Sequence, residues 1–270
     1  RAIGKQPRFE LVLNTVGGAV EAPWPIVNLI REFCDKFAVL LPHRAHSAGT
    51  LLCLGADEIV MTPLSILGPI DPSRTHHLLP AGKDADSSVE VSVQDMRHAM
   101  TFVKEAFGPA AKYESDAMAR ILTALFDKVH PLAIGAIEQS YALAKLIARR
   151  CLSTHMDEKQ QASEIARIVD ALCDEFKSHQ YEINRGEAKR LGLKVTYAPA
   201  AVENAMTELL KFYVSRPVYP PAPAPPAPGS QLTSVVAWLE STQMSMRVIA
   251  DYQVGQGGQL QPIGDRWTVF

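Results

Sequence analysis

Two short turns hold the residue types that acyl transfer needs. The glycine pair Gly17-Gly18 follows an apolar run at 9–14, and Ser47-Ala48 follows a second apolar run at 37–41. A serine hydroxyl can act as a nucleophile, and backbone N–H groups at a glycine turn can stabilise the oxyanion that forms. A lone serine before a helix is more often an N-cap, but two such turns in one chain favour catalysis.

The elements that must position these turns alternate between strand and helix. Apolar, β-rich runs predict strands at 9–14, 37–41 and 57–61, and helical spacing of apolar residues predicts a helix over 25–36. Strand, helix, strand implies a parallel crossover. Catalytic groups gather at the carboxyl ends of parallel strands, where both turns fall. The acidic pair Asp57-Glu58 is expected at the solvated edge of its strand.

The second half of the chain is predicted to be mainly helical. Helices are expected to begin near Ser92, Ser115, Pro131 and Asp157, and a last strand is expected at 193–197. His130, directly before Pro131, is expected to cap a helix. The fold class is therefore α/β, with a parallel sheet, flanking helices and a helical C-terminal half.

Proline content divides the chain into three parts. Residues 1–215 are predicted to form the catalytic domain, and the proline-rich stretch 216–230 is predicted to be an extended linker. Residues 231–270 are interpreted as an amphipathic tail and a possible docking element. The polar stretch 74–91 is expected to be a mobile loop.

Composition excludes several classes of protein. A net charge of −2, with 27 basic against 29 acidic residues, argues against a nucleic-acid partner. The sequence has no apolar run long enough to span a membrane, so a cytoplasmic location is expected, although an upstream segment could still carry an anchor. The four cysteines are predicted to be buried, reduced thiols. No metal site and no cofactor are expected, because no histidine or cysteine cluster has ligand spacing and no GxGxxG is present.

Several motifs together resemble one known family. The motifs are Asn14-Thr15-Val16-Gly17-Gly18, Leu41-Pro42-His43-Arg44-Ala45-His46-Ser47-Ala48-Gly49-Thr50, Ala56-Asp57-Glu58-Ile59-Val60-Met61 and Leu67-Gly68-Pro69-Ile70-Asp71-Pro72. They resemble the serine dehydrogenase proteinase family, a relative of signal peptide peptidase A and the Clp proteolytic subunit. The resemblance covers roughly residues 9–197 and implies a ClpP/crotonase-like fold.

The resemblance also implies site residues. Ser47 would be the nucleophile, and Gly17, Gly18 and Ala48 would surround the oxyanion. A Clp-type triad would place its base near Asp71 and its acid near His179. Because a triad is defined by roles and not by chain order, we predict an exchange, with His179 as the base and Asp71 as its orienting acid.

Other assignments of the base stay open at this point. His46 adjoins Ser47, but neighbouring side chains usually diverge, and Lys83 falls in the expected mobile loop. A purely structural interpretation has His179 capping a helix and Asp71 fixing its loop.

These residues predict a serine peptidase that cleaves a peptide or protein substrate, and the resemblance implies that it assembles as a homo-oligomer. Two alternatives are a catalytically inactive scaffold of the same fold and a crotonase-like acyl-CoA enzyme that uses the oxyanion hole without a nucleophile.

Overall fold

The computed structural model describes residues 4–75, 90–92, 95, 98–99, 101–102, 105, 115–176, 178–214, 228–241, 244–255 and 260–269. The chain divides into two compact units, Arg1–Met206 and Thr207–Phe270, each of which is described by itself. The expected mobile loop at 74–91, including Lys83, and the helix expected from Ser92 lie largely outside the described residues.

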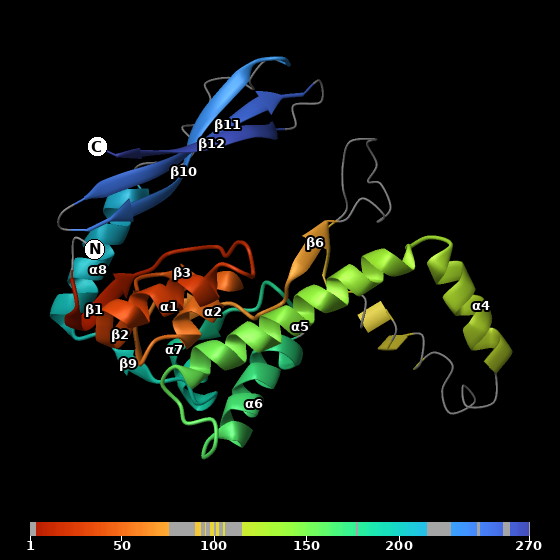
Figure 1. Cartoon of the computed structure of the whole chain (residues 1–270), viewed down its shortest axis with the longest axis horizontal. Coiled ribbons are helices and arrows are strands. Elements are labelled where there is room, and N and C mark those ends of the chain that lie inside the picture. The colour runs from red at the N-terminus through yellow and green to blue at the C-terminus, as the bar shows by residue number, and fades with distance from the viewer. Residues whose placement is uncertain are drawn as a thin grey trace. The chain divides into compact units, whose positions relative to one another are not determined.

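A four-stranded parallel sheet forms the centre of the first unit (Figure 1). Its strands are β1 (Gln6–Val12), β2 (Cys34–Leu41), β4 (Glu58–Met61) and β9 (Val195–Tyr197), hydrogen-bonded in the order β1-β2-β4-β9. β2 and β4 are the central strands and carry the apolar, mostly buried residues that a sheet covered by helices requires. The predicted α/β architecture is confirmed.

Helices pack beside this sheet. α1 (Pro23–Phe33) begins with a proline, whose missing N–H is not needed in the first turn. α2 (Ala48–Leu54) is buried along its whole length and packs on α1 and on the long helix α5 (Pro131–Ser153). His130 caps α5 as predicted, because its Nδ1 accepts a hydrogen bond of 3.2 Å from the Leu132 N–H.

Further helices of this unit precede or follow α5 in the chain. α4 (Ser115–Phe126) precedes α5, and α6 (Ala162–Asp170) packs on α5 and continues into a π-helix, η2 (Ala171–Glu175). α7 (Arg185–Arg190) begins at Asn184, whose side chain accepts hydrogen bonds from two backbone N–H groups at the helix start.

A second, smaller sheet has no counterpart in the sequence prediction. It consists of β3 (Arg44–Ala45), β5 (Ile66–Leu67) and β8 (Ile183–Asn184), in that order. β3 and β5 are parallel, whereas β5 and β8 are antiparallel. A separate pair, β6 (Ser73–Thr75) with β7 (Glu90–Ser92), is antiparallel. The β3-β5-β8 sheet links three distant segments and holds the two turns in place.

One hydrophobic core joins β2, α2, β4, α5 and α6. Its largest fully buried side chains include Phe37, Leu41, Leu51, Met61, Ile137 and Leu172. All four cysteines are buried and free, as the sequence predicts.

The second unit contains a meander of three antiparallel strands. β10 (Gln231–Glu240), β11 (Ser245–Val254) and β12 (Leu260–Val269) follow one another in sheet order. The helix α8 (Ala200–Val214) crosses the boundary between the two units. The segment that the sequence describes only as amphipathic therefore forms strands. Most of the predicted linker, residues 215–227, lies outside the described residues.

Candidate active site at the Ser47 and Gly17 turns

Ser47 occupies a strained turn between β3 and α2. Its backbone has φ 50° and ψ −112°, and it is the one non-glycine residue with positive φ in the described part of the chain. Such a conformation costs about 1–3 kcal/mol and is kept only where the surroundings enforce it. Sharp strand-to-helix turns of this kind present a nucleophile in several hydrolase families.

The hydroxyl of Ser47 does not cap α2. No side-chain capping bond forms there, and the helix is held instead through backbone bonds from Gly49 N–H to His46 O (2.8 Å) and from Leu51 N–H to Ser47 O (3.1 Å). The ordinary role of a serine before a helix is therefore absent. The hydroxyl is left available for chemistry.

The Gly17 turn lies directly against Ser47. A Cβ atom on Gly17 would be 2.9 Å from the carbonyl oxygen of His46, 3.2 Å from Ser47 Cβ and 3.6 Å from the Ala48 nitrogen. Gly17 also has φ 109°, which side-chain-bearing residues rarely adopt. The backbones of the two turns therefore approach each other closely. This agrees with the sequence prediction that both turns lie at the carboxyl ends of parallel strands.

Thr15 fixes the Gly17 turn to β3. It forms a parallel bridge with Ala45, its N–H donates to Arg44 O at 2.9 Å, and its Oγ1 accepts from Gly17 N–H at 3.1 Å. The Gly17 N–H thus already donates a hydrogen bond to Thr15 and is not free to bind an oxyanion. Of the three residues assigned to the oxyanion hole, Gly18 and Ala48 are the ones whose N–H groups make no hydrogen bond within the described residues.

Thr50 and Gly68 brace the turn from the other side. The buried hydroxyl of Thr50 lies 2.9 Å from Ala45 O and 2.7 Å from Gly68 O, and the Gly68 N–H donates to Ala45 O at 2.9 Å. A Cβ atom on Gly68 would be 3.0 Å from Cα, Cβ and Cγ of His46. The His46 side chain therefore packs on the bare backbone of Gly68.

The two residues predicted to activate Ser47 lie in different surroundings. His179 is exposed, and its charge acts on His46. Asp71 is buried at 4% exposure, next to Ile70, whose N–H donates to Leu172 O in η2. Asp71 acts electrostatically on Cys173, whose pKa is raised to about 12, first by burial. The exchanged triad of Ser47, His179 and Asp71 stays a prediction.

Sequence reasoning gave no role to Thr15, Thr50 or Gly68. All three lie inside the motifs that carry the family resemblance. The signal that could have singled out Gly68 is its place before Pro69, where a side chain is absent and the backbone is rigid. The threonines act through hydrogen bonds to segments that only the folded chain brings near.

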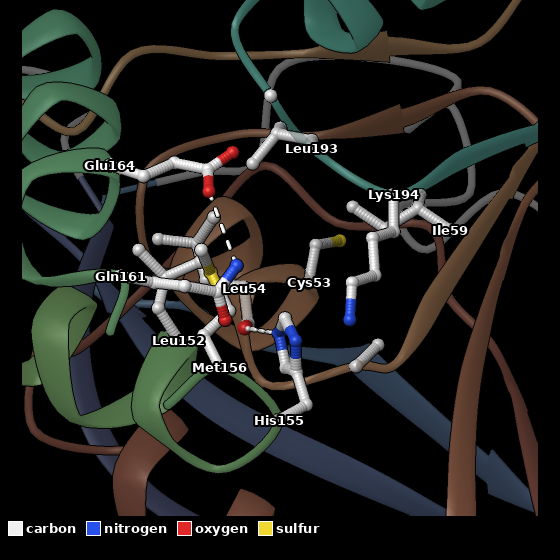
Figure 2. Close-up of a pocket in the computed structure, with 12 residues that line it drawn as sticks. Cys53, Leu54, Ile59, Leu152, His155, Met156, Gln161, Glu164, Leu193 and Lys194 are labelled. Atoms are coloured by element: carbon white, nitrogen blue, oxygen red, sulfur yellow. Dashed lines mark hydrogen bonds between the residues drawn. The ribbon is translucent and has the colours of Figure 1, made fainter. Parts of the chain in front are cut away.

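Figure 2 shows a small cavity whose lining includes neither Ser47 nor Gly17. It has a volume of about 40 Å³ and is lined by Cys53 and Leu54 at the far end of α2, together with His155, Glu164 and Lys194. This space holds about two or three water molecules, too little for a peptide. A wider, open cleft between Arg8, Lys36 and Thr196 lies at the starting ends of the parallel strands. Neither hollow includes Ser47.

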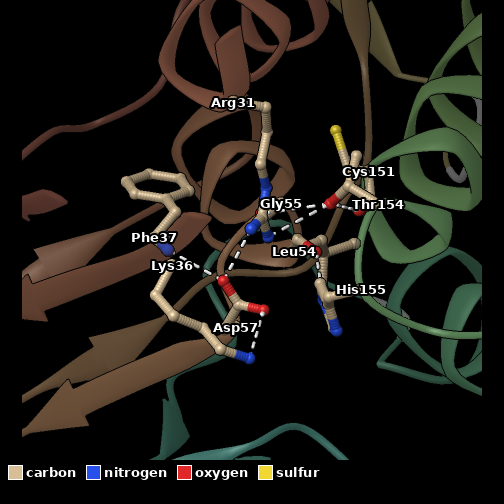
Figure 3. A network of polar contacts seen from close by, with 9 residues as sticks. All are labelled: Arg31, Lys36, Phe37, Leu54, Gly55, Asp57, Cys151, Thr154 and His155. Atoms are coloured by element: carbon tan, nitrogen blue, oxygen red, sulfur yellow. Dashed lines mark hydrogen bonds and ion pairs between the residues drawn. The ribbon is translucent and has the colours of Figure 1, made fainter. Parts of the chain in front are cut away.

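The acidic pair Asp57-Glu58 is not a solvated edge, and this expectation was wrong. Asp57 Oδ2 accepts from Arg31 at 2.6 Å and from the Phe37 N–H at 2.8 Å, and Arg31 also donates to Gly55 O (Figure 3). Burial alone would raise the pKa of Asp57, but the Phe37 N–H and Arg31 lower it overall. Glu58 pairs with Arg8 at 2.9 Å. Asp57 thus joins α1 and β2 to the turn that follows α2, whereas Glu58 joins β4 to β1.

Within the described residues, no three His, Cys, Asp or Glu side chains converge as a metal site would require. The helices described here include none with both the length and the apolar character of a membrane span.

Comparison with known proteins adds two kinds of match. Two uncharacterized proteins of Methanocaldococcus jannaschii are similar to this chain. The first is 28% identical over 212 residues, which is 78% of this chain and 61% of the relative. The second is 39% identical over 75 residues, which is 27% of this chain and 26% of the relative. The chain therefore spans less than two thirds of the length of either relative.

The other match is to a protein family. The family model described as ClpP-like SDH-type serine proteinase matches residues 1–97, and a parallel four-stranded sheet flanked by helices agrees with a ClpP-like fold. The part of the chain that is similar to this family thus contains both turns.

Proposed function

We propose that this protein is a serine peptidase that hydrolyses peptide bonds through an acyl-enzyme on Ser47. The observation that carries the proposal is the contact of the Gly17 turn with the strained Ser47 turn, at 3.2 Å from a Gly17 Cβ position to Ser47 Cβ. The match of residues 1–97 to a serine proteinase family model supports it.

In the proposed reaction, Ser47 Oγ attacks the carbonyl carbon of the scissile bond and its proton passes to the base. The carbonyl oxygen becomes an oxyanion, which the N–H groups of Gly18 and Ala48 stabilise. Collapse of the tetrahedral intermediate breaks the C–N bond, and the base returns the proton to the leaving amine. Water then repeats these steps on the ester and frees Ser47.

The substrate is a peptide or protein segment in extended form. We expect it to lie along the rim of the Gly17 turn, where its backbone adds to the exposed strand edge. The base follows the sequence prediction, with His179 taking the proton. Asp71 is the residue that the sequence predicts to orient the His179 ring. A homo-oligomer that shields the site belongs to the same proposal, and light scattering of the purified chain measures its size.

The decisive experiment is labelling of the purified protein with a fluorophosphonate, which reacts with activated serine hydroxyls. Wild type is compared with Ser47→Ala, His179→Ala and Asp71→Ala. We expect labelling of wild type, no labelling of Ser47→Ala, and at least about a 100-fold slower reaction of His179→Ala.

Other results would favour the alternatives. A folded, assembled wild type that never labels would contradict the peptidase and favour an inactive scaffold. Turnover of an acyl-CoA thioester that survives Ser47→Ala would instead favour the crotonase-like enzyme.

A further inference from the structure

His46 carries a ring nitrogen that is buried without a hydrogen bond. Its Nε2 is shielded from solvent and has no partner within the described residues. The backbone on both sides is fixed, since the His46 N–H donates to Thr15 O at 3.3 Å and its carbonyl accepts from Gly49 N–H at 2.8 Å. Buried polar atoms in native proteins are nearly always paired, so an unpaired one needs an explanation.

The ring of His46 lies where the β5–β8 pair brings in a distant segment. It packs on Gly68, which directly follows β5, and Leu67 of β5 pairs with Ile183 of β8. Continuing this antiparallel register by one residue places Glu182 opposite Gly68. This register brings Glu182 near the His46 ring, and His179 precedes Glu182 by three residues in the chain.

The charges around His46 agree with this placement. Burial first, and then the charges of Arg44 and His179, lower the pKa of His46, while Glu182 opposes them and His43 adds a small lowering effect. His46 is therefore neutral at neutral pH. A neutral imidazole has one nitrogen that accepts a hydrogen bond and one that donates.

We propose that His46 is a positioning residue of the peptidase site, and that its Nε2 accepts a hydrogen bond from the ring N–H of His179. This inference rests on the proposed function, which makes His179 the base for Ser47. It transfers the orienting role from Asp71, whose charge acts on Cys173 of η2, to His46.

The hydrogen bond would fix the tautomer of His179. With one ring N–H directed at His46, the other nitrogen of His179 carries a lone pair and can accept the proton from Ser47 Oγ. His179 becomes an imidazolium in the tetrahedral intermediate and then gives that proton to the leaving amine. His46 stays neutral throughout, and Glu182 stabilises the positive charge that develops beside it.

A double-mutant cycle tests the pairing in the full chain. The rate of fluorophosphonate labelling and the kcat and KM for a peptide substrate are measured for His46→Ala, His179→Ala and the double variant. We expect His46→Ala to label at least about tenfold slower, with the loss in kcat and not in KM. The double variant should be no slower than His179→Ala alone, because residues that act as a unit are not additive.

Two further variants separate positioning from a packing defect. His46→Gln keeps an amide acceptor and is expected to recover part of the rate. His155→Gln is the matched control, since His155 is another partly buried histidine whose pKa burial lowers, at the far end of α2. It should label at the wild-type rate.

The results distinguish this pairing from the proposed function. If Ser47-dependent labelling is intact but His46→Ala reacts within twofold of wild type, or if the two single losses multiply in the double variant, the pairing is wrong and the peptidase stands. If Asp71→Ala slows labelling as much as His179→Ala while His46→Gln does not, the orienting role returns to Asp71. Absence of labelling in wild type removes both proposals.

Imidazole NMR adds a readout that does not depend on activity. Removing His179 takes a positive charge and a donor away from His46, so the His46 ring should titrate at higher pH in His179→Ala than in wild type. An unchanged His46 titration contradicts the pairing.

Discussion

Ser47 keeps an unfavourable backbone conformation because two distant segments, one with Thr15 and Gly17 and one with Gly68, fix its neighbours. Thr15 holds the residue before it, Gly17 allows the backbones to touch, and Thr50 ties the following helix to Ala45 and Gly68. Strain of this kind persists only where the surrounding contacts over-determine it, and it is concentrated at functional sites. The geometry of the site therefore depends on small residues as much as on the nucleophile.

Gly17→Ala should damage both stability and reactivity. The new Cβ would lie 2.9 Å from the His46 carbonyl oxygen, at a φ of 109°. We expect a loss of about 1–3 kcal/mol in the free energy of unfolding and at least about tenfold slower labelling of Ser47, because a small displacement of the reacting groups is costly. Urea denaturation and labelling rates measure these two effects.

The matched control is Gly135→Ala in α5. Its Cβ would meet no atom within 4 Å, and its backbone is helical. This substitution should stabilise the protein by up to about 1 kcal/mol and leave labelling unchanged. Equal effects of the two variants would refute the role given to the Gly17 contact.

At this scale, the sequence predicts the reactive residues better than their supports. Ser47, Gly17 and Gly18 could be found because each follows an apolar strand and has a residue type tied to acyl transfer. The packing of His46 on Gly68 could not be found, because it depends on β3 and β5, which have two residues each. Such short strands leave no periodic pattern in the sequence.

At the scale of the elements, one polar network anchors α1 to the sheet (Figure 3). Asp57 accepts from Arg31 and from the Phe37 N–H, and Arg31 also reaches Gly55 O. Removing the carboxylate charge would leave Arg31 half-buried with weaker partners. Asp57→Asn should therefore lower the free energy of unfolding by about 1–3 kcal/mol, measured by urea denaturation at pH 7.

Two checks accompany this prediction. Asp35→Asn removes an exposed pair with Lys5 and should cost less than about 0.5 kcal/mol. Because the folded-state pKa of Asp57 is lowered, its contribution is present above about pH 4 and lost as pH falls further. Wild type and Asp57→Asn should thus converge in stability at low pH, and a constant difference would contradict the assignment.

His155 connects the ends of α2 and α5 and responds in a different pH window (Figure 2). Its Nε2–H donates to Leu54 O at 3.0 Å. Burial, then the charges of Lys194 and Arg31, lower its pKa, while the Leu54 carbonyl and Asp57 oppose the shift. As pH falls through about 6.5, His155 therefore takes up a proton in the unfolded chain more readily than in the folded chain.

The stability that His155 contributes should be present above about pH 6.5 and decline below it. The decline for one proton is at most about 1.4 kcal/mol per pH unit. The difference in unfolding free energy between wild type and His155→Gln should shrink from pH 7 to pH 5, as followed by urea denaturation. The pKa of His46 is also lowered, but His46 is present in both wild type and His155→Gln. Its contribution to the pH dependence therefore cancels in the difference between their unfolding free energies. A difference that grows toward pH 5 would show that His155 is more basic in the folded state.

Most of the element boundaries followed from simple patterns, and the exceptions have physical causes. The sequence predicts a strand at 9–14, where β1 is found at Gln6–Val12, and a helix start at Pro131, where α5 begins. The three C-terminal strands were missed. The register of β10 shifts between Val235 and Ala237, which breaks the alternation of apolar and polar residues that identifies a strand.

At the scale of the whole molecule, the main hydrophobic core of the described residues lies in the first unit, and the second unit buries Ile249, Ala250 and Val254 of β11. Every residue of the buried cluster lies between Val27 and Val195. Trp24 of α1 packs against that cluster, whereas Trp238 and Trp267 belong to the second unit, and these are the three tryptophans of the chain. Once Trp238 and Trp267 are replaced, tryptophan fluorescence reports on the unfolding of the first unit through Trp24.

A chain ended after Val214 should keep the fold and reactivity of the first unit. We compare it with full-length protein carrying Trp238→Phe and Trp267→Phe, so that Trp24 is the sole reporter in both. Because no residue of the buried cluster between Val27 and Val195 is removed, the free energy of unfolding in urea, followed by Trp24 fluorescence, should change by less than about 1 kcal/mol. Ser47 should label at an unchanged rate. A truncated chain that unfolds earlier, or that stays folded but no longer labels, would show that the second unit contributes to the catalytic unit through contacts or assembly. Light scattering of both chains distinguishes these causes, since only loss of assembly changes the molar mass beyond that of the removed residues.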